Sequence, residues 1–219
     1  VQTCALPIYL RAAGVPVFGP GRDGALLEAS KSWAKQLMRE AGIPTAEHWS
    51  ASTEEQALAA LEAHGRPLVV KADGLAAGKG VIVAETVAQA IEAARDMLEG
   101  NRFGAAGSCV VIEEFMAGEE VSLFALTDGE HVLPLIGAQD HKRAFDGDKG
   151  PNTGGMGAYS PVPILDAGMT ERVMREIVQP TVRGMKADGI PFKGALYAGL
   201  MIDAKGPRLV EYNCRFGDP

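Results

Sequence analysis

Residues 68–84 read LVVKADGLAAGKGVIVA, two short apolar, β-branched runs around a glycine-rich loop. Such runs predict a pair of strands. Glycines let the backbone approach a ligand closely and present its N–H groups to anionic oxygens, and Lys71 and Lys79 add positive charge. Because two lysines and three glycines exceed what a hairpin turn requires, we interpret residues 74–80 as a loop that covers phosphate rather than as a solvated tip.

The spacing excludes the best-known glycine-rich phosphate motifs. A Walker loop has four residues between its glycines, Ser or Thr after the lysine, and a helix behind it. Here Gly74 and Gly78 enclose three residues, Gly80 follows Lys79, and a strand pattern comes next. The pattern is not G-x-G-x-x-G either. We therefore expect a lid that folds over a nucleotide from above.

Composition and charge narrow the class of protein. The chain has 219 residues, of which 47% are hydrophobic and 22% charged, which is typical of globular proteins and sufficient for two lobes. A net charge of −7 argues against a nucleic-acid binder, and the apolar runs are too short to span a bilayer. The three cysteines form no C-x-x-C pattern, which predicts a reducing compartment. We expect a cytoplasmic protein without a nucleic-acid, membrane or obligate protein partner.

Hydrophobic patterning around the loop predicts a small α+β region. Lys31 and Lys35 lie one turn apart on its first helix, and we interpret Lys35 as part of a solvated face. The predicted elements are a strand over 15–20, a helix over 24–41 capped by Asp23, a strand over 46–51, a helix over 56–64 begun by a Ser52–Glu55 capping box, and a helix capped by Thr86.

The second half predicts further antiparallel strands and one helix. Strands are expected over 110–116, 121–126, 131–138, 195–203 and 208–215, with turns at 128–129 and 204–206. A helix over 170–188 contains Pro180, which predicts either a kink or two pieces. Residues 139–161 are long, polar and glycine-rich, and loops of this kind are usually functional or disordered. We favour a substrate loop, and we assign no catalytic role to His141 because no partner pattern accompanies it.

The last strand carries Glu211, Asn213 and Arg215, which alternation places on one face. Carboxylate and amide oxygens suit a hard cation such as Mg²⁺, and a guanidinium suits a phosphoryl group. A polar face on an edge strand would also explain the pattern. Beside the lysine-bearing loop, we favour a magnesium–phosphate site.

These motifs resemble those of a known superfamily. Ser30-Lys31, residues 70–80, Glu113-Glu114-Phe115, Gly118-Glu119-Glu120 and Glu211-x-Asn213-x-Arg215 occur in the order found in ATP-grasp proteins. Within that superfamily, QDHKR at 139–143, GPNTGGMGAYSP at 150–161 and RFGDP at 215–219 resemble the glycinamide ribonucleotide synthetase (phosphoribosylamine–glycine ligase) family. The resemblance covers the chain from residue 9 onward.

The resemblance implies an α+β, ATP-grasp fold with the nucleotide between two lobes that carry antiparallel sheets. Residues 113–116 would be the hinge strand facing adenine, Glu120 would hold the ribose, and Glu211 and Asn213 would bind Mg²⁺ or Mn²⁺. Arg215 and Lys71 would act on the phosphoryl group in flight. The implied ATP-binding residues are Lys31, Lys71, Gly74, Gly78, Lys79, Gly80, Glu113, Glu114, Phe115, Met116 and Glu120.

The resemblance also implies ATP-dependent ligation in de novo purine (IMP) biosynthesis. Glycine would attack the γ-phosphate to form glycyl phosphate, and the amine of 5-phosphoribosylamine would then displace phosphate. Such chemistry needs positioning and charge neutralisation, which agrees with a site without a nucleophilic side chain. The implied substrate-binding residues are Asp140, Lys142, Arg143, Asn152, Thr153, Gly154, Gly155 and Asp218.

The sequence departs from this resemblance in two ways. Many superfamily members have another metal carboxylate on the strand before the last, but residues 197–201 read YAGLM, so we expect phosphate and water to complete the coordination. Both ends also look cut: there is no initiator Met, and the first eight residues match a translated sequencing adapter. We expect this piece alone to be inactive. The expected parts are an adapter-derived artefact (1–8), the remnant of an N-terminal domain (9–22), a connecting helix (23–46), a small lid lobe (47–115) and a large lobe truncated at its C-terminus (116–219).

Two other functions are compatible with parts of the pattern. One is a different ATP-grasp ligase, such as a carboxylase or another purine enzyme, against which the motif at 150–161 argues. The other is a regulatory module that binds nucleotide without turnover. The presence of Glu211, Asn213 and Arg215 together weighs against that loss of chemistry.

Overall fold

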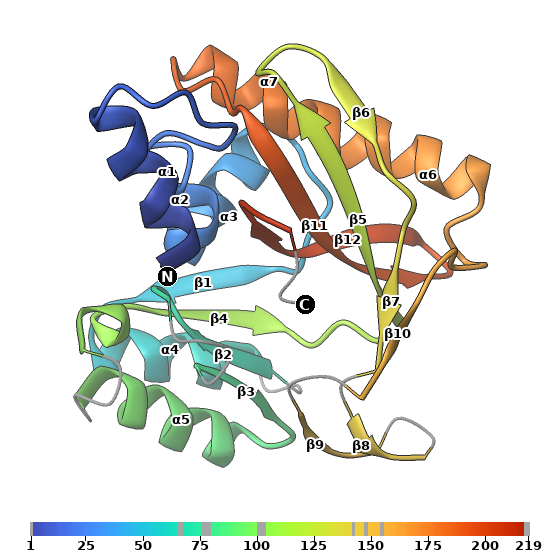
Figure 1. Cartoon of the computed structure of the whole chain (residues 1–219). Helices are drawn as coiled ribbons and strands as arrows, with labels where there is room; N and C mark the ends of the chain where they lie inside the picture. Colours follow the sequence, from blue (N-terminus) through green and yellow to red (C-terminus); the bar gives the residue numbers. More distant parts are fainter. Residues whose placement is uncertain are drawn as a thin grey trace.

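The computed structural model describes residues 2–64, 68–75, 80–99, 104–141, 143–146, 149–153 and 156–216. Two antiparallel sheets of four strands each form the frame, one below the other in Figure 1, and helices cover the outer face of each. The α+β fold class expected from the sequence is confirmed.

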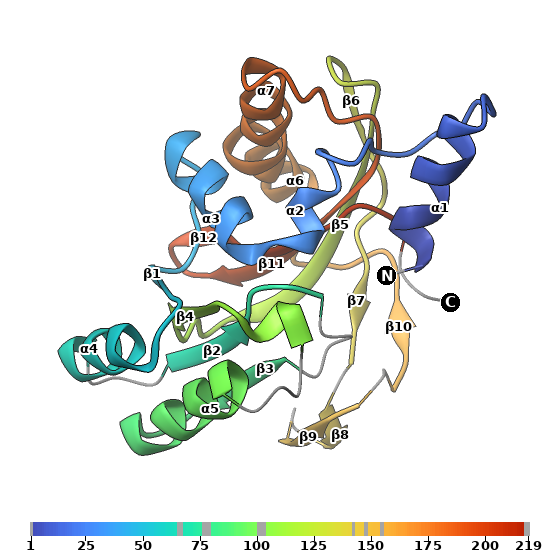
Figure 2. The same ribbon diagram turned by 90° about the vertical axis from the view of Figure 1, so that its left-hand side faces the viewer.

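The first sheet contains the predicted hairpin. Its strand order is β1 (His48–Ala51), β4 (Val110–Glu114), β2 (Leu68–Ala72) and β3 (Val81–Ala84). Leu68, Val70 and Ile112 are buried in a cluster with residues of α4 (Glu54–His64) and α5 (Val87–Glu99), which lie together on one face of this sheet (Figure 2). Because strand residues alternate between faces, Lys71 and Glu113 lie on the opposite face.

Both of these helices begin with a threonine cap. The hydroxyl of Thr53 accepts a hydrogen bond from the N–H of Gln56 at 3.2 Å, and Thr86 caps α5 in the same way. The predicted Thr86 cap is therefore confirmed. The predicted Ser52–Glu55 box is wrong by one residue. Thr53 supplies the capping hydroxyl, and the side-chain oxygen of Gln56 accepts a hydrogen bond from the N–H of Ser52.

The second sheet has the strand order β12 (Gly206–Asn213), β11 (Gly194–Asp203), β5 (Glu119–Thr127) and β6 (Val132–Pro134). One helical run covers it, made of α6 (Ala167–Val173), the π-helical η2 (Met174–Val178) and α7 (Gln179–Ala187) (Figure 1). Pro180 lies at the start of α7, directly after the π-helical η2, and the helical run continues through it. Neither this run nor any other described helix is long and apolar enough to cross a membrane.

The region before the first sheet differs from two expectations. Residues 15–20 do not form the predicted strand; three of their carbonyls instead accept hydrogen bonds from Arg11 of α1 (Gln2–Ala12). The single helix predicted over 24–41 is two, α2 (Leu26–Ala29) and α3 (Lys31–Glu40). Ser30 separates them because its backbone is extended and its side chain caps α3 by accepting from the N–H of Trp33.

The polar segment over 139–161 contains short strands. β7 (Gln139–Asp140) pairs with β10 (Ala158–Tyr159), and β8 (Arg143–Phe145) pairs with β9 (Lys149–Asn152). The two ends of the segment therefore lie side by side next to the second sheet, where Ala138 also bridges Ser122 of β5.

The two sheets meet at two places along the described chain. In the first, Thr45 lies beside Leu209 of β12, whose N–H donates to the carbonyl of Pro44 at 2.8 Å. The second leads from β4 to β5 through Gly118, which has a φ of +151°. A Cβ on Gly118 would lie 2.4 Å from the carbonyl oxygen of Ile202, so the close approach of the backbones requires glycine there.

We expect Gly118→Ala to destabilise the chain by about 3 kcal/mol, because alanine adds both backbone strain and a clash with a fixed carbonyl. The matched control is Gly189→Ala, which also has a positive φ, of +76°, but no atom within 4 Å of the added Cβ. That control should cost about 1 kcal/mol. Urea unfolding of both variants measures the difference, and equal midpoints would show that the clash at Ile202 is relieved cheaply.

Candidate nucleotide site

Charged side chains gather on the faces of the two sheets that point away from α4, α5 and the run from α6 to α7. The first sheet presents Lys71 and Glu113 there, and the second presents Glu211, which pairs across the sheet with Gly199. Lys31, at the start of α3, lies within electrostatic range of all three charged groups. The fold therefore brings together lysines and carboxylates that are far apart in the sequence.

The base of the glycine-rich loop is fastened to the start of α3. The ammonium of Lys31 donates to the carbonyls of Ala72, at 2.9 Å, and Gly74, at 3.0 Å. The carboxylate of Asp73 accepts from the N–H of Ser32 at 2.6 Å, which also satisfies a free donor of the first helical turn. These contacts fix the segment that leads into the loop.

Two of the predicted loop glycines are described, and each has a structural role. A Cβ on Gly74 would lie 2.6 Å from the Cβ of Ala106 in η1 (Gly104–Gly107), so this glycine allows close packing. The carbonyl of Gly80 accepts from the N–H of Ala72 at 2.8 Å and closes the strand pair. The predicted Gly78 and Lys79 lie outside the described residues.

The electrostatic environment of Lys31 reflects this crowding. Burial lowers the pKa of Lys31, and the positive charge of Lys71 lowers it further. Glu211, Asp73 and Glu113 oppose the shift without cancelling it. A cation held in this way gains stability from any additional anion, such as a phosphate, that reaches it.

Glu113 is the most buried charged group of the site. It is 2% exposed, and its Oε2 atom contacts two ammonium groups, that of Lys71 at 3.0 Å and that of Lys35 at 3.3 Å. The interpretation of Lys35 as a solvated residue is wrong, because it too is only 2% exposed. Its helix face turns toward the first sheet, and no local sequence pattern indicates that a buried carboxylate, Glu113, contacts it there.

Two opposing effects act on the pKa of Glu113. Burial alone would raise it, but the charges and hydrogen bonds of Lys71 and Lys35 outweigh burial and hold the pKa below the ordinary value. Its other oxygen, Oε1, has no hydrogen-bond partner among the described residues. The Glu113 carboxylate is thus ionised, and both of its lysine partners contact the same oxygen, Oε2.

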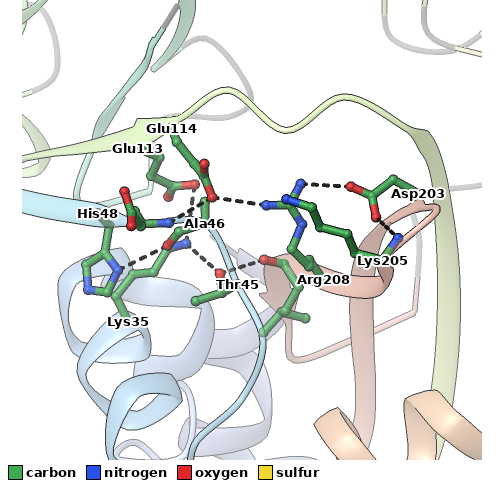
Figure 3. A network of polar contacts seen from close by, with 11 residues as sticks. Lys35, Thr45, Ala46, His48, Glu113, Glu114, Asp203, Lys205 and Arg208 are labelled. Atoms are coloured by element: carbon green, nitrogen blue, oxygen red, sulfur yellow. Dashed lines mark hydrogen bonds and ion pairs between the residues drawn. The ribbon is translucent and has the colours of Figure 1, made fainter. Parts of the chain in front are cut away.

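Glu114, the next residue of the chain, joins the two sheets through its side chain (Figure 3). Its carboxylate contacts the guanidinium of Arg208, on β12, at 3.0 Å, and Arg208 contacts Asp203 at 3.1 Å. Arg208 and Asp203 were not predicted as site residues. The Glu114 side chain is therefore bound to the second sheet.

The rest of the predicted hinge differs in exposure. Phe115 is 46% exposed, whereas Met116 is 6% exposed. Glu120 lies on β5, where its backbone carbonyl accepts from the side chain of Gln139 at 3.0 Å. Glu120 shares one face of the second sheet with Glu211, since residue 120 pairs with Met201 on the face that also carries Gly199.

The end of β12 gathers the third group of predicted residues. Arg215 reaches Asn213 at 3.5 Å and Glu28 of α2 at 3.3 Å. Glu28 also accepts from the N–H of Cys214 at 2.8 Å, so this glutamate holds the strand end in place. Sequence reasoning missed Glu28, because a single carboxylate on a short helix carries no motif.

The predicted metal ligands are the Glu211 carboxylate and the Asn213 amide oxygen, and both supply the hard oxygen donors that Mg²⁺ and Mn²⁺ prefer. No group of three His, Cys, Asp or Glu that could hold a metal occurs among the described residues. The residues present therefore fit a cation that takes its remaining ligands from phosphate and water, which is the usual mode for Mg²⁺.

Only part of the predicted substrate set can be placed. Asp140 pairs with Ala158, and Arg143 pairs with Asn152, so the segment brings these positions together along two short ladders. Thr153 is half-buried beside them. The other predicted substrate residues lie outside the described part of the chain: Lys142, Gly154, Gly155 and Asp218.

Comparisons with known proteins agree with this geometry. Residues 29–219 match the family described as phosphoribosylglycinamide synthetase, ATP-grasp (A) domain. The chain is 60% identical over 210 residues to the phosphoribosylamine–glycine ligase of Xanthomonas axonopodis pv. citri. The matched region covers 95% of this chain and 48% of that relative. The crystal structure of phosphoribosylamine–glycine ligase from Thermotoga maritima is similar, with 40% identity and a TM-score of 0.85 over 93% of this chain and 51% of that one.

A more distant structure shares the fold alone. The biotin carboxylase of Campylobacter jejuni, at 19% identity, has a TM-score of 0.77 over 99% of this chain and 47% of its own. The chain spans about half the length of the curated relatives it matches.

We expect Glu113→Gln to destabilise the chain by about 3 kcal/mol, because it leaves two buried ammonium groups without their shared carboxylate. The stabilising effect of Glu113 is present above its unfolded pKa of about 4.5 and is lost as pH falls through its lower folded pKa. The variant should therefore lose less stability than the wild type on acidification. Urea unfolding between pH 3 and pH 7 measures both effects.

The control for that experiment is Glu130→Gln, which removes an exposed carboxylate paired with Lys186. This substitution should leave the unfolding midpoint unchanged, because exposed ion pairs contribute little. Equal effects of the two substitutions would contradict the assignment of Glu113 as a buried, ionised group.

Proposed function

Since the chain belongs to the phosphoribosylglycinamide synthetase ATP-grasp (A) domain family, we propose that the protein containing it is a phosphoribosylamine–glycine ligase. This enzyme would join glycine to 5-phosphoribosylamine and convert ATP to ADP and phosphate, in de novo purine biosynthesis in the cytoplasm. The observation that carries the proposal is the meeting of Lys31, Lys71 and Glu211 between the two sheets. Cations for phosphate and an oxygen ligand for a metal are what phosphoryl transfer needs.

ATP would lie between the charged faces of the two sheets. Its phosphates would contact Lys31 and Lys71, and the loop over 74–80 would cover them. The backbone of residues 113–116 would face adenine, and Glu120 would accept the ribose hydroxyls. The position of Lys31 supports this arrangement, because its ammonium lies at the start of the loop, where it donates to the carbonyls of Ala72 and Gly74.

A divalent cation would be held by Glu211 and Asn213. When bound, Mg²⁺ or Mn²⁺ would neutralise charge on the phosphates of ATP. Arg215 would face the transferred phosphoryl group, and its contacts with Asn213 and Glu28 keep the guanidinium at the end of β12. Arg215, Lys71 and Lys31 together would stabilise the charge that spreads over the phosphoryl oxygens.

The reaction would proceed in two displacements. A carboxylate oxygen of glycine attacks the γ-phosphorus, the bond to the β-phosphate oxygen breaks, and ADP leaves. The amine of 5-phosphoribosylamine then attacks the carbonyl carbon of glycyl phosphate, loses a proton, and expels inorganic phosphate. No protein nucleophile is required, so the side chains act by positioning and by neutralising charge.

The segment over 139–161 would bind glycine and the amine substrate. In its described part, Asp140 pairs with Ala158 beside the second sheet, Arg143 pairs with Asn152 in a separate short ladder, and Thr153 follows Asn152. Carboxylate and guanidinium groups are suited to an amine and to a phosphate or carboxylate, respectively. The roles of the individual residues are part of the proposal.

The direct test is phosphate release by the full-length parent protein. Release should require ATP, a divalent cation, glycine and 5-phosphoribosylamine together. Turnover with bicarbonate in place of glycine would instead indicate a carboxylase. ATP binding without formation of ADP under any of these conditions would indicate a regulatory nucleotide-binding module.

Lys71→Ala and Glu211→Ala should impair the full-length enzyme in different ways. Lys71→Ala should raise the KM for ATP about tenfold or more, because it removes a phosphate contact made before and during the reaction. Glu211→Ala should lower kcat about a hundredfold at saturating ATP, because it removes a ligand of the metal that acts in the transition state. Steady-state kinetics separates the two effects, and Lys186→Ala serves as a control on the surface; identical profiles would contradict this division of roles.

A further inference from the structure

Lys35 is a buried cation to which the proposed mechanism assigns no role. Its side chain is 2% exposed, and its ammonium donates to the hydroxyl of Thr45 at 2.7 Å and contacts Glu113 at 3.3 Å (Figure 3). Burying an ammonium group costs several kcal/mol, and an apolar side chain of the same length would fill the space at lower cost. The charge of Lys35 therefore calls for an explanation other than packing.

The explanation lies in the oxygen that Lys35 shares with Lys71. Both ammonium groups contact the same atom, Oε2 of Glu113. Lys71 and Glu113 alone would form a neutral pair, whereas the three groups together carry one net positive charge. Lys71 lies on β2 of the first sheet, whereas Lys35 reaches the same carboxylate oxygen from α3.

Lys35 also connects the first sheet to the strand that carries the proposed metal ligands. The Thr45 hydroxyl, which accepts from Lys35, donates to the carbonyl of Leu209 at 2.7 Å. Leu209 lies on β12, two residues before Glu211. A chain of contacts thus runs from Lys71 through Glu113, Lys35 and Thr45 to the second sheet.

We propose that Lys35 is a positioning residue for the triphosphate of ATP: by sharing Glu113 with Lys71, it keeps the Lys71 ammonium available to the phosphates and holds it in register with β12. Without Lys35, Glu113 would neutralise Lys71 fully, and the phosphates would meet one charge fewer. The inference rests on the proposed function only in taking ATP as the ligand between the sheets.

The test is MgATP affinity, measured by calorimetry on the full-length parent protein without glycine. Lys35→Met should weaken binding about tenfold, the effect expected for the loss of one nearby, poorly screened charge. Steady-state kinetics should show kcat at saturating ATP and the KM for glycine within about twofold of wild type. Lys35→Gln, which keeps a donor for Thr45 but not the charge, should weaken ATP binding to a similar extent and carries the test if the methionine variant does not fold.

The double variant Lys35→Met/Glu113→Gln restores the original net charge of the group. It should bind MgATP more tightly than Lys35→Met alone, which a purely structural role for Lys35 would not produce. The matched control is Thr181→Val, which removes a fully buried hydroxyl that bonds to Tyr212 in the core of the second sheet. That control should lose stability without a change in ATP affinity.

A pH series adds a readout specific to the charge. Burial lowers the pKa of Lys35 to about 8, so ATP binding by the wild type should weaken as pH rises through that value and Lys35 loses its proton. The charged and titratable groups that face Lys35 are Glu113, Lys71, Glu114 and His48. Since Lys35→Met retains all four, its binding should lack this transition.

The outcomes separate this inference from the proposed function. Wild-type affinity for MgATP in both Lys35→Met and Lys35→Gln, or no recovery in the double variant, overturns the role of Lys35 even if turnover requires glycine. Weakened binding with recovery supports it even if turnover uses another acceptor.

Discussion

The carboxylate of Glu113 is the group on which the site depends. It lies on the central part of the first sheet, between β1 and β2, and is shielded from water on all sides. An ionised carboxylate in such a place requires positive partners, because desolvation alone would drive it to the neutral form. Lys71 and Lys35 meet that requirement from two different elements, so the folding of α3 against the first sheet and the charge of the site are parts of one interaction.

The same strand also fixes the relation between the two sheets. Glu113 faces the lysines, and its neighbour Glu114 reaches Arg208 on β12. Glu113 and Glu114 together therefore supply both the buried charge of the site and an ion pair to the second sheet. Gly118 then allows the chain to pass within contact distance of Ile202 before it enters β5. The surfaces proposed to face the nucleotide are consequently held by contacts that lie next to the site.

Much of this arrangement was predictable from local patterns. The strand pair around the glycine loop, the Thr86 cap and the final pair of strands follow from alternation and turn residues that act over a few positions. The shared face of Lys71 and Glu113 is also partly predictable, since antiparallel pairing of β2 with β4 places both side chains on the same side of the sheet. What local patterns could not give were contacts between distant segments.

Lys35 and Ser30 illustrate this limit. A lysine on an amphipathic helix normally faces water, and only the presence of Glu113 on another element makes a buried position tenable. Ser30 breaks the helix predicted over 24–41 because Asp73, which follows β2, accepts hydrogen bonds from the N–H of Ser32 and from the Ser30 hydroxyl. The carbonyls of residues 15–20 are satisfied by Arg11 rather than by a neighbouring strand. In each case the decisive partner is remote in sequence.

The distribution of charge agrees with the proposal that this acidic chain binds a polyanion. The net charge of −7 would repel a nucleoside triphosphate, but at physiological ionic strength charges on the surface are screened over about 8 Å. Buried charges are screened much less, so the balance among Lys31, Lys35, Lys71 and the carboxylates beside them dominates the potential that a bound phosphate experiences. Around Glu113 that balance is positive. Affinity for phosphate is therefore set by which charges the fold buries, and only weakly by their sum over the chain.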